Sequence, residues 1–485
     1  MEIKKSDILL VVVPPFLVRM PHIGVAYLSR YLRAKGFNPA VYDLSIELHN
    51  NAAPDLKRYW RVDFLNNYFC TEIADMLYRD FKSQIDKFVD DFLASDTRVI
   101  GFTVNIINIF LVNRIAKLIK DKDPSRFIIL GGPATFFHHP RDMIAPCHAD
   151  LCVIGEGEEL LTNILKAYYR GKKINSAPGI LLGKDLGKYQ PLPGPLIARL
   201  DDIPFPDYSE FDLSQYNPDT DYQPIPILMS RGCVRRCAYC IDCLMWPKYR
   251  SRSAGHVVQE IAYHIKNNKT KAFEMVDLCC NGDLKQLAQI CDLIIDSRLQ
   301  FPWVSYAIIR DGMTPELFTK LKMAGCDTLI YGVENGSDRI LKLMGKNYTA
   351  VKASEVIRMT HDAGIRVNIN LILGFPGETE DDFNKTLEFV KANRPYVNEV
   401  TNVSGCTLFP EADLGRNKRK YGVLFQDGTD PMLFTDTNGV DRVERHKRVA
   451  RMVEQINAMG LSKAIVNEAA LNPTVKTMLE NEKNK

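Results

Sequence analysis

Four cysteines lie within eleven positions of one short stretch, RGCVRRCAYCIDC at residues 231–243, as Cys233, Cys237, Cys240 and Cys243. Thiolates bind soft metals and also form redox dithiols, so their spacing has to distinguish the two uses. Structural zinc commonly uses two CxxC pairs separated by a longer loop, and a redox CxxC would leave Cys233 without a role. A CxxxCxxC loop suits a cubane iron–sulfur cluster better, because three thiolates hold three irons and leave the fourth open. Zinc and a dithiol remain the alternatives.

Apolar stretches that alternate with helical ones surround this loop. From residue 227, the stretch ILMS leads into the cysteines, and KAFEMVDL, WVSYAIIR, TLIYGVE and RVNINLILG follow as expected strands. Six or so β–α units of this kind fit a full or partial TIM-type barrel, with chemistry at the carboxyl ends of its strands. The alternation therefore predicts a partial (β/α)6 barrel over 227–409 and a small C-terminal helical region over 410–485.

A second α/β series precedes the cysteines. Its alternation predicts a parallel, Rossmann-like sheet over residues 1–175 that binds a ligand at the carboxyl ends of its strands. Residues 176–226 are rich in Pro, Gly and Asp and are expected to form a linker. The expected strands are 7–13, 38–45, 99–104, 127–133 and 151–159, and the expected helices are 23–36, 113–122 and 160–171.

The stretch GCVRRCAYC, after a short strand in a partial-barrel series, closely resembles the radical S-adenosylmethionine (radical SAM) superfamily. The resemblance implies a 4Fe-4S cluster on Cys233, Cys237 and Cys240, with SAM on the fourth iron. One electron then breaks a carbon–sulfur bond of SAM and yields a 5′-deoxyadenosyl radical. Cys243 is left out of the ligand set, because a fourth thiolate would leave SAM no iron to bind. Tyr239 matches the family's aromatic position beside adenine.

Two later segments extend the resemblance. YGVENGSDRILKLMGK (331–346) is similar to the family's G-x-E-S-G-S segment, and NINLILGFPGET (368–379) is similar to its G-x-P-G-E-T segment. SAM needs carboxylates or amides for its diol and ammonium, and a cation for its carboxylate. The resemblance implies that Glu334 bonds the ribose or amino group, and Arg310 is placed to meet the carboxylate. The other strand-end polar residues predicted for this pocket are Asp277, Asn281 and Asn370.

The first α/β series carries a resemblance of its own. The order P-H-I-G-x-A-Y-L, VIGFTV, LGGP and GEGE resembles the cobalamin-binding domain of cobalamin-dependent radical SAM enzymes, and PFPDYSEFDL resembles their linker. This implies a cobalamin cofactor, and glycines would let the backbone approach its flat corrin and nucleotide tail. The predicted cobalamin contacts are Thr103, Asn105, Asn108, Gly131, Gly132, Pro133, Gly155, Glu156 and Gly157.

His22 departs from the classical cobalamin pattern. Cobalamin proteins with a histidine lower ligand carry D-x-H-x-x-G after the first strand, and this chain has RMPHIG there. The aspartate partner and the spacing are missing, so His22 is interpreted as a helix-capping or packing residue. The resemblance then implies base-off cobalamin without a protein histidine.

Composition narrows the partners of this 485-residue chain. Hydrophobic residues make up 46% and charged residues 25%, which is typical of globular domains, and the net charge of +3 predicts no nucleic-acid partner. No apolar run approaches the roughly 20 residues of a membrane helix. Twelve cysteines without a recognisable signal peptide favour metal ligation or core packing over disulfides and predict a cytoplasmic protein.

The implied cofactor set predicts a C-methyltransferase that methylates an unactivated carbon through methylcobalamin and the 5′-deoxyadenosyl radical. A cobalamin-dependent cyclase or rearrangement enzyme without methyl transfer is the second hypothesis, and a non-catalytic iron–sulfur or cobalamin carrier or sensor is the third. A peptide or protein residue is the favoured substrate class, because the pocket motifs contain no long apolar run suited to a lipid. A ferredoxin or flavodoxin is the expected electron donor.

Overall fold

The protein is described here by a computed structural model. It divides into two compact units, residues 1–226 and 227–485. The structure describes residues 3, 5–16, 18–61, 71–136, 144–186, 188, 192–217, 222–426 and 433–461. Parts of the predicted linker and of the predicted C-terminal region, including 462–485, therefore lie outside the described residues.

A six-stranded sheet in the order β2-β1-β3-β4-β5-β6 forms the first unit. Its first five strands are parallel and β6 pairs antiparallel with β5. Buried apolar runs such as ILLVV in β1 are typical of a parallel sheet that helices cover on both faces. Its strands are β1 (Ile8–Val12), β2 (Pro39–Asp43), β3 (Val99–Thr103), β4 (Phe127–Gly131), β5 (Leu151–Val153) and β6 (Ile180–Leu182).

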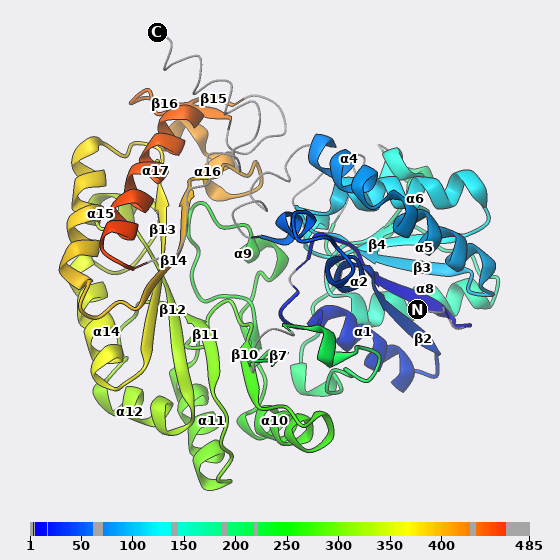
Figure 1. Cartoon of the computed structure of the whole chain (residues 1–485), viewed down its shortest axis with the longest axis horizontal. Helices are drawn as coiled ribbons and strands as arrows, with labels where there is room; N and C mark the ends of the chain where they lie inside the picture. The colour runs from blue at the N-terminus through cyan, green and yellow to red at the C-terminus, as the bar shows by residue number, and fades with distance from the viewer. Residues whose placement is uncertain are drawn as a thin grey trace. The chain divides into compact units, whose positions relative to one another are not determined.

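Helices lie on both sides of this sheet. α1 packs on α8, and α6 packs on α4 and α5, with the strands between the two groups (Figure 1). The expected α/β architecture is confirmed, although α8 begins at Gly157, where the sequence predicted a strand that continues to residue 159. The helices are α1 (Ile23–Ala34), α2 (Leu44–Asn50), α4 (Thr71–Asp80), α5 (Lys82–Ala94), α6 (Ile109–Lys122) and α8 (Gly157–Tyr169). Short 3₁₀ turns are η1 (Leu56–Trp60), η2 (Pro133–Phe136), η3 (Ala145–Cys147), η4 (Gly183–Asp185), η5 (Leu200–Asp202) and η6 (Leu213–Gln215).

A second six-stranded sheet, in the order β14-β13-β12-β11-β10-β7, forms the partial barrel that was expected from residue 227 on. This open sheet and its helices are called the half-barrel. Neighbouring strands from β10 to β14 pair in parallel, so their carboxyl ends meet at one edge. Helices such as α14 and α15 cover its outer side (Figure 1). The strands are β7 (Pro224–Ile227), β10 (Ala272–Met275), β11 (Trp303–Ala307), β12 (Cys326–Glu334), β13 (Arg366–Leu373) and β14 (Glu399–Gly405), beside the short pair β8 (Ser230–Arg231) and β9 (Arg250–Ser251).

The helices of the second unit begin at clear caps. Thr379 and Asp382 form a capping box at the start of α15, and Asp441 caps α17. The helices are α9 (Asp242–Met245), α10 (Ala254–Asn268), α11 (Leu284–Asp296), α12 (Pro315–Met323), α13 (Asp338–Leu343), α14 (Ala350–Asp362), α15 (Glu380–Asn393), α16 (Asp413–Arg416) and α17 (Arg442–Ala458). A 3₁₀ turn η7 (Lys418–Tyr421) and a hairpin of β15 (Val423–Gln426) and β16 (Phe434–Asp436) lie before α17.

The helix α17, in the predicted C-terminal region, packs on the second sheet, where it contacts β13, β14 and α15. Two of its arginines are buried. Arg445 donates to the carbonyls of Gly374, Phe434 and Val440, and Arg448 donates to the carboxylate and carbonyl of Glu378. Both guanidinium groups thereby hold the GFPGET loop that follows β13.

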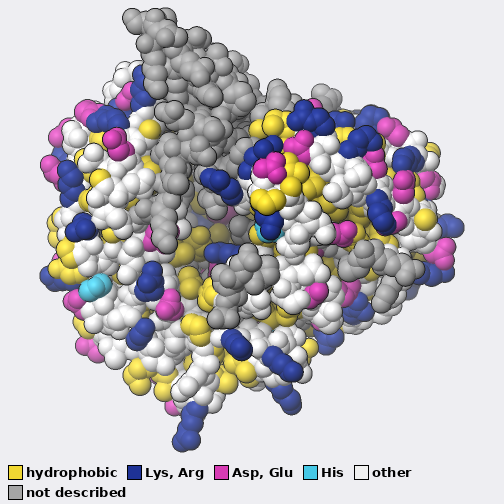
Figure 2. Space-filling model, in the orientation of Figure 1, with side chains coloured by type: hydrophobic (Ala, Val, Ile, Leu, Met, Phe, Trp, Pro, Cys, Tyr) yellow, Lys and Arg dark blue, Asp and Glu magenta, His cyan; other side chains and the backbone are white. Residues whose placement is uncertain are grey.

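Charged side chains of both signs lie on the surface (Figure 2). On the face shown in Figure 2, basic and acidic side chains alternate and neither charge forms a continuous field. Within the described ranges, the structure contains no helix whose length and apolarity would let it cross a membrane.

Candidate functional site

The cluster loop, residues 232–241, follows β8 at the carboxyl edge of the half-barrel. Its cysteines Cys233, Cys237 and Cys240 are partly exposed and free, whereas Cys279 and Cys280 are buried. Across the described residues, no three His, Cys, Asp or Glu side chains converge as a single metal ion would require. In a cubane each thiolate binds a different iron, and three accessible thiols on one short loop fit that arrangement.

The environment of the three thiols is uneven. A side-chain hydrogen bond with Cys279 lowers the pKa of Cys233 to about 6, and burial raises the pKa of Cys237 and of Cys240. Cys243, in α9, donates its S–H to the carbonyl of Cys240, 3.3 Å away and before that helix. From the sequence, Cys279 could be either a packed strand-end residue or a catalytic or redox thiol, and its contact with Cys233 makes it a direct neighbour of the predicted cluster.

Tyr239 and Glu334 meet although 95 positions separate them. The Tyr239 hydroxyl donates to Glu334 Oε1 over 3.0 Å, and burial raises the pKa of Tyr239, so the hydroxyl stays protonated. Glu334 ends β12 with φ of +69°, in the left-handed region that a non-glycine residue adopts only where its surroundings hold it. The aromatic residue predicted to lie beside adenine and a carboxylate are thus joined at the predicted SAM pocket.

Lys346 and Tyr348 were missed by the sequence reasoning. Lys346 Nζ lies 3.2 Å from Glu334 Oε1 and 3.2 Å from the carbonyl of Gly332. The Tyr348 hydroxyl lies 3.0 Å from the carbonyls of Gly332 and Val333. Lys346 stands in the quoted segment 331–346, but no spacing rule indicated that it would fold back onto Glu334.

Asn281 and Arg310 form a second group at the same edge. The Asn281 amide exchanges two hydrogen bonds with the backbone of Ile308, at 2.8 and 2.9 Å. Arg310 Nη1 donates to the carbonyls of Asn281 and Gly282 at 2.8 and 2.7 Å. Nε and Nη2 of Arg310 have no partner among the described residues. The guanidinium is therefore fixed through Nη1, and its other N–H groups remain available to donate to the carboxylate of a ligand.

The Asp277 carboxylate is bound by residues of the protein. It accepts from the backbone N–H of Met229 and from the Ser230 hydroxyl, and burial raises its pKa to about 6. It thereby fixes the strand that leads into the cluster loop. A direct bond from Asp277 to SAM stays a prediction.

Asn370 has a buried side-chain oxygen, Oδ1, without a hydrogen-bond partner among the described residues. Asn370 lies opposite Gly332 in the register of β12 and β13, next to the strand end that carries Glu334. Buried polar atoms are almost always paired, so an orphaned oxygen here fits a pocket that binds a polar ligand such as SAM.

In the first unit, the predicted cobalamin residues lie at the carboxyl ends of β3, β4 and β5. Asn105 and Asn108 close the loop after β3: Asn108 Oδ1 accepts from Asn105 N at 2.8 Å, and its amide donates to the carbonyls of Val13 and Thr103. Pro133 opens the 3₁₀ turn after β4 and is exposed. Contact of these residues with cobalamin stays a prediction.

Close packing of the chain on itself already requires glycine at some of these strand ends. A Cβ on Gly132 would lie 2.6 Å from the carbonyl of Val104, and both Gly132 and Gly155 have positive φ. Glu156 caps α8 through backbone geometry, and its Oε2 accepts from Ile197 N at 2.6 Å. Gly131 and Gly157 are less constrained, because a Cβ on either would come no closer than 3.8 and 3.2 Å to another side chain.

His22 caps α1, as the sequence predicted. Its Nδ1 accepts from Val25 N at 3.2 Å, its Nε2 lies 3.3 Å from Thr103 Oγ1, and burial lowers its pKa to about 4. Both ring nitrogens are therefore engaged inside the first unit. A neutral, fully engaged imidazole fits the expectation that His22 is not a cobalt ligand.

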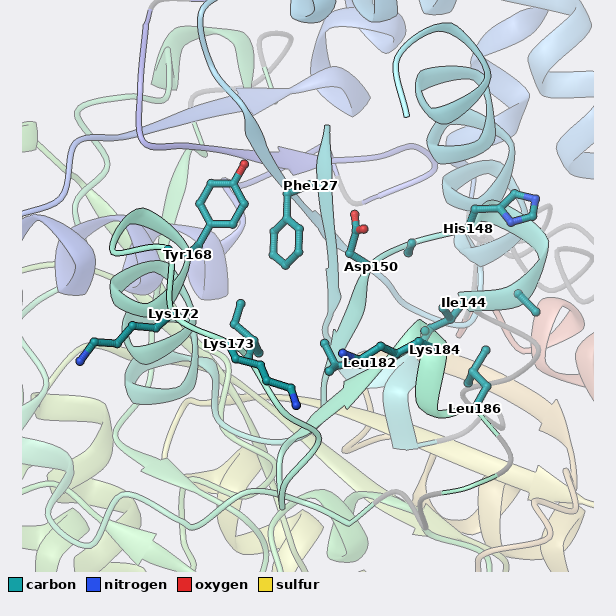
Figure 3. Close-up of a pocket in the computed structure, with 15 residues that line it drawn as sticks. Phe127, Ile144, His148, Asp150, Tyr168, Lys172, Lys173, Leu182, Lys184 and Leu186 are labelled. Carbon is teal, nitrogen blue, oxygen red and sulfur yellow. The ribbon is translucent and has the colours of Figure 1, made fainter. Parts of the chain in front are cut away.

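A separate hollow in the first unit lies at the other edge of its sheet (Figure 3). Phe127 and Asp150 line it at the amino ends of β4 and β5, together with Tyr168 and Lys184. None of the predicted cofactor residues lines this hollow, so it is distinct from the candidate site.

Comparisons with known proteins agree with this geometry. Residues 227–390 match the radical SAM superfamily, and residues 9–165 match the B12 binding domain. An uncharacterized methyltransferase of Pyrococcus horikoshii is 27% identical over 321 residues, which is 65% of this chain and 67% of that protein. The anaerobic magnesium-protoporphyrin IX monomethyl ester cyclase of Rubrivivax gelatinosus is 25% identical over 81% of this chain and 65% of its own length. The chain thus spans about two thirds of these curated relatives.

Two solved structures share the fold. The radical SAM methyltransferase TsrM from Kitasatospora setae, with cobalamin and a [4Fe-4S] cluster bound, has a TM-score of 0.65 at 17% identity and covers 91% of this chain and 81% of its own. The cobalamin-dependent radical SAM enzyme OxsB, with aqua-cobalamin and SAM bound, has a TM-score of 0.70 at 16% identity and covers 99% and 71%.

A cobalamin-binding α/β sheet and a radical SAM half-barrel with a three-cysteine loop define a class of enzyme. The chain belongs to the cobalamin-dependent radical SAM enzymes. Its cofactors are a 4Fe-4S cluster, SAM and cobalamin.

Proposed function

We propose that the chain is a C-methyltransferase that methylates an unactivated carbon. The observation that carries the proposal is the combination, in one chain, of a B12 binding domain with a radical SAM domain whose cluster loop carries Tyr239, which donates to Glu334. The similarity to a Pyrococcus horikoshii protein named as a methyltransferase supports methyl transfer as the outcome.

When bound, the cluster with SAM supplies a hydrogen-abstracting radical, and cobalamin supplies a methyl carrier. The residues proposed to hold the cluster are Cys233, Cys237 and Cys240. Glu334 would accept from the ribose or amino group of SAM, and the unpaired donors of Arg310 would meet its carboxylate. The orphaned Oδ1 of Asn370 would accept from a further donor.

The cobalamin contacts are proposed at the carboxyl edge of the first sheet. Gly131 and Gly157 are the less constrained glycines there, and Thr103 Oγ1 lies 3.3 Å from His22 Nε2. Because the His22 imidazole caps α1, it would not be free to bind cobalt.

The favoured substrate class remains a peptide or protein residue, and a ferredoxin or flavodoxin remains the proposed electron donor. A cytoplasmic location is proposed with them. The substrate proposal rests on the motifs of the sequence, which contain no long apolar run suited to a lipid.

A cyclase or rearrangement enzyme is the second candidate. It is favoured by the similarity to the Rubrivivax gelatinosus cyclase, which extends over 81% of this chain. Such an enzyme would use the same cofactors without consuming the methyl group of SAM.

Product analysis separates the two candidates without a known substrate. The full chain, reconstituted anaerobically with iron, sulfide and cobalamin, is incubated with SAM and a reductant. A methyltransferase produces S-adenosylhomocysteine in addition to 5′-deoxyadenosine, because one SAM gives up its methyl group. Formation of 5′-deoxyadenosine alone would contradict methyl transfer and support the second candidate.

A further inference from the structure

The turn after α13, residues 344–348, packs against the cluster loop. The backbone N–H of Ala238 donates to the carbonyl of Met344 at 2.9 Å. Gly345 has φ of +78°, and a Cβ there would lie 3.3 Å from the carbonyl of Arg236 and 3.8 Å from Cys237 Cα. The backbone of this turn therefore touches the loop between the first and third predicted iron ligands.

Lys346 extends from the same turn to the end of β12. Its side chain is 8% exposed and pairs with Glu334, whose side chain is 12% exposed. Burial lowers the pKa of the Lys346 ammonium, but the negative groups around it, with Glu334 first among them, together outweigh burial and raise the pKa. Lys346 is therefore charged, and removing it would leave the buried carboxyl of Glu334 without its cation.

Lys346 and Tyr348 also hold the backbone that precedes Glu334. Their donors bind the carbonyls of Gly332 and Val333, directly before the left-handed residue. A non-glycine residue adopts this strained conformation only where its surroundings hold it there. The turn supplies that restraint at the point where β12 and β13 shift register.

The two donors to Glu334 bind the same oxygen. Tyr239 Oη and Lys346 Nζ both contact Oε1, and no described residue donates to Oε2. One oxygen is thus fixed by the protein, and the other keeps its acceptor capacity.

We propose that Lys346 positions Glu334 for SAM binding. Lys346 holds Oε1 of Glu334 and the end of β12, so that Oε2 can accept a hydrogen bond from an N–H or O–H donor of SAM. The proposal rests on the cofactor class and on the predicted role of Glu334, and it does not depend on methyl transfer. It also links the Glu334 side of the SAM pocket to the cluster loop through one turn of chain.

The test measures SAM affinity of the anaerobically reconstituted full chain by equilibrium dialysis, and the EPR spectrum of the reduced cluster with and without SAM. K346M should weaken SAM binding about 10- to 100-fold, the range of a charge-assisted hydrogen bond, and reduce the SAM-induced spectral change. K346R should recover most of the affinity. The matched control is K342M on the preceding helix α13, where Lys342 is exposed, and its affinity should be unchanged.

A double variant distinguishes positioning from a direct contact. If Lys346 acts through Glu334, E334Q and E334Q/K346M bind SAM equally weakly, because the second change removes nothing further. If K346M alone does not fold, E334Q and the double variant E334Q/K346M still test the proposal, because neither leaves an unpaired buried charge at Glu334. Wild-type affinity in K346M, or losses that multiply in the double variant, would overturn it. Absence of S-adenosylhomocysteine would contradict methyl transfer and leave this result unaffected.

Discussion

Replacing Arg448 should expose how α17 supports the GFPGET loop. Arg448 is 7% and Glu378 0% exposed in their side chains, and Nη1 lies 3.0 Å from Oε1. Asn335 donates to the other oxygen, Oε2, at 3.2 Å. R448M leaves a buried carboxylate without its cation, which costs about 3–5 kcal/mol of unfolding free energy.

The loss should depend on pH in a defined direction. Burial already raises the pKa of Glu378, and removal of Arg448 raises it further. A folded-state pKa above the unfolded value means that the ionised carboxyl destabilises the fold as pH rises, whereas protonation at low pH removes the penalty. The difference between wild type and R448M should therefore be largest near pH 8 and shrink by about 1.4 kcal/mol per pH unit below the variant's carboxyl pKa.

Urea unfolding between pH 5 and 8 measures this difference. Hydrogen exchange of the β13 amides serves as the readout, because it reports unfolding of the second unit even if the two units unfold separately. R451M is the matched control on the same helix. The pair of Arg451 with Glu380 is 48% and 51% exposed, so its loss should cost under about 1 kcal/mol. An equal cost of R448M at pH 5 and pH 8, or an equal cost of R451M, would refute the reasoning.

Three further outcomes are expected. G132A should destabilise the first unit by about 1–3 kcal/mol in urea unfolding, because of positive φ and the 2.6 Å approach to the Val104 carbonyl, whereas G36A meets no atom and isolates the φ cost. H22A should remove about 1 kcal/mol of capping stability and leave the EPR spectrum of bound cob(II)alamin unchanged; lost nitrogen splitting would identify His22 as a ligand. D277N should reduce the loss of stability that raised carboxyl pKa values cause as pH rises from about 4 to 6, since the pKa of Asp277 is raised to about 6; an unchanged pH profile would contradict this.

The sequence was informative where chemistry is local. The cysteine loop and the strand-end residues Glu334 and Arg310 could be placed at one edge, because alternating β–α units bring the carboxyl ends of parallel strands together. The capping role of His22 also followed from a short segment.

Contacts between distant segments could not be predicted. Arg448 reaches Glu378 across 70 positions, and Lys346 folds back over 12 positions onto Glu334 through a turn that no periodicity describes. Asn108 was expected to contact cobalamin, and its amide is occupied by two backbone carbonyls of its own unit. Residue type indicated polar sites, but the partner depended on tertiary packing.

If the cluster loop makes this chain a radical SAM enzyme, its three cysteines are needed to cleave SAM. The 5′-deoxyadenosine formed from SAM by the reconstituted, reduced full chain is compared with that of a variant in which Cys233, Cys237 and Cys240 are all alanine. We expect 5′-deoxyadenosine and iron–sulfur absorbance with wild type and neither with the variant. SAM cleavage that persists in the triple variant would contradict this expectation.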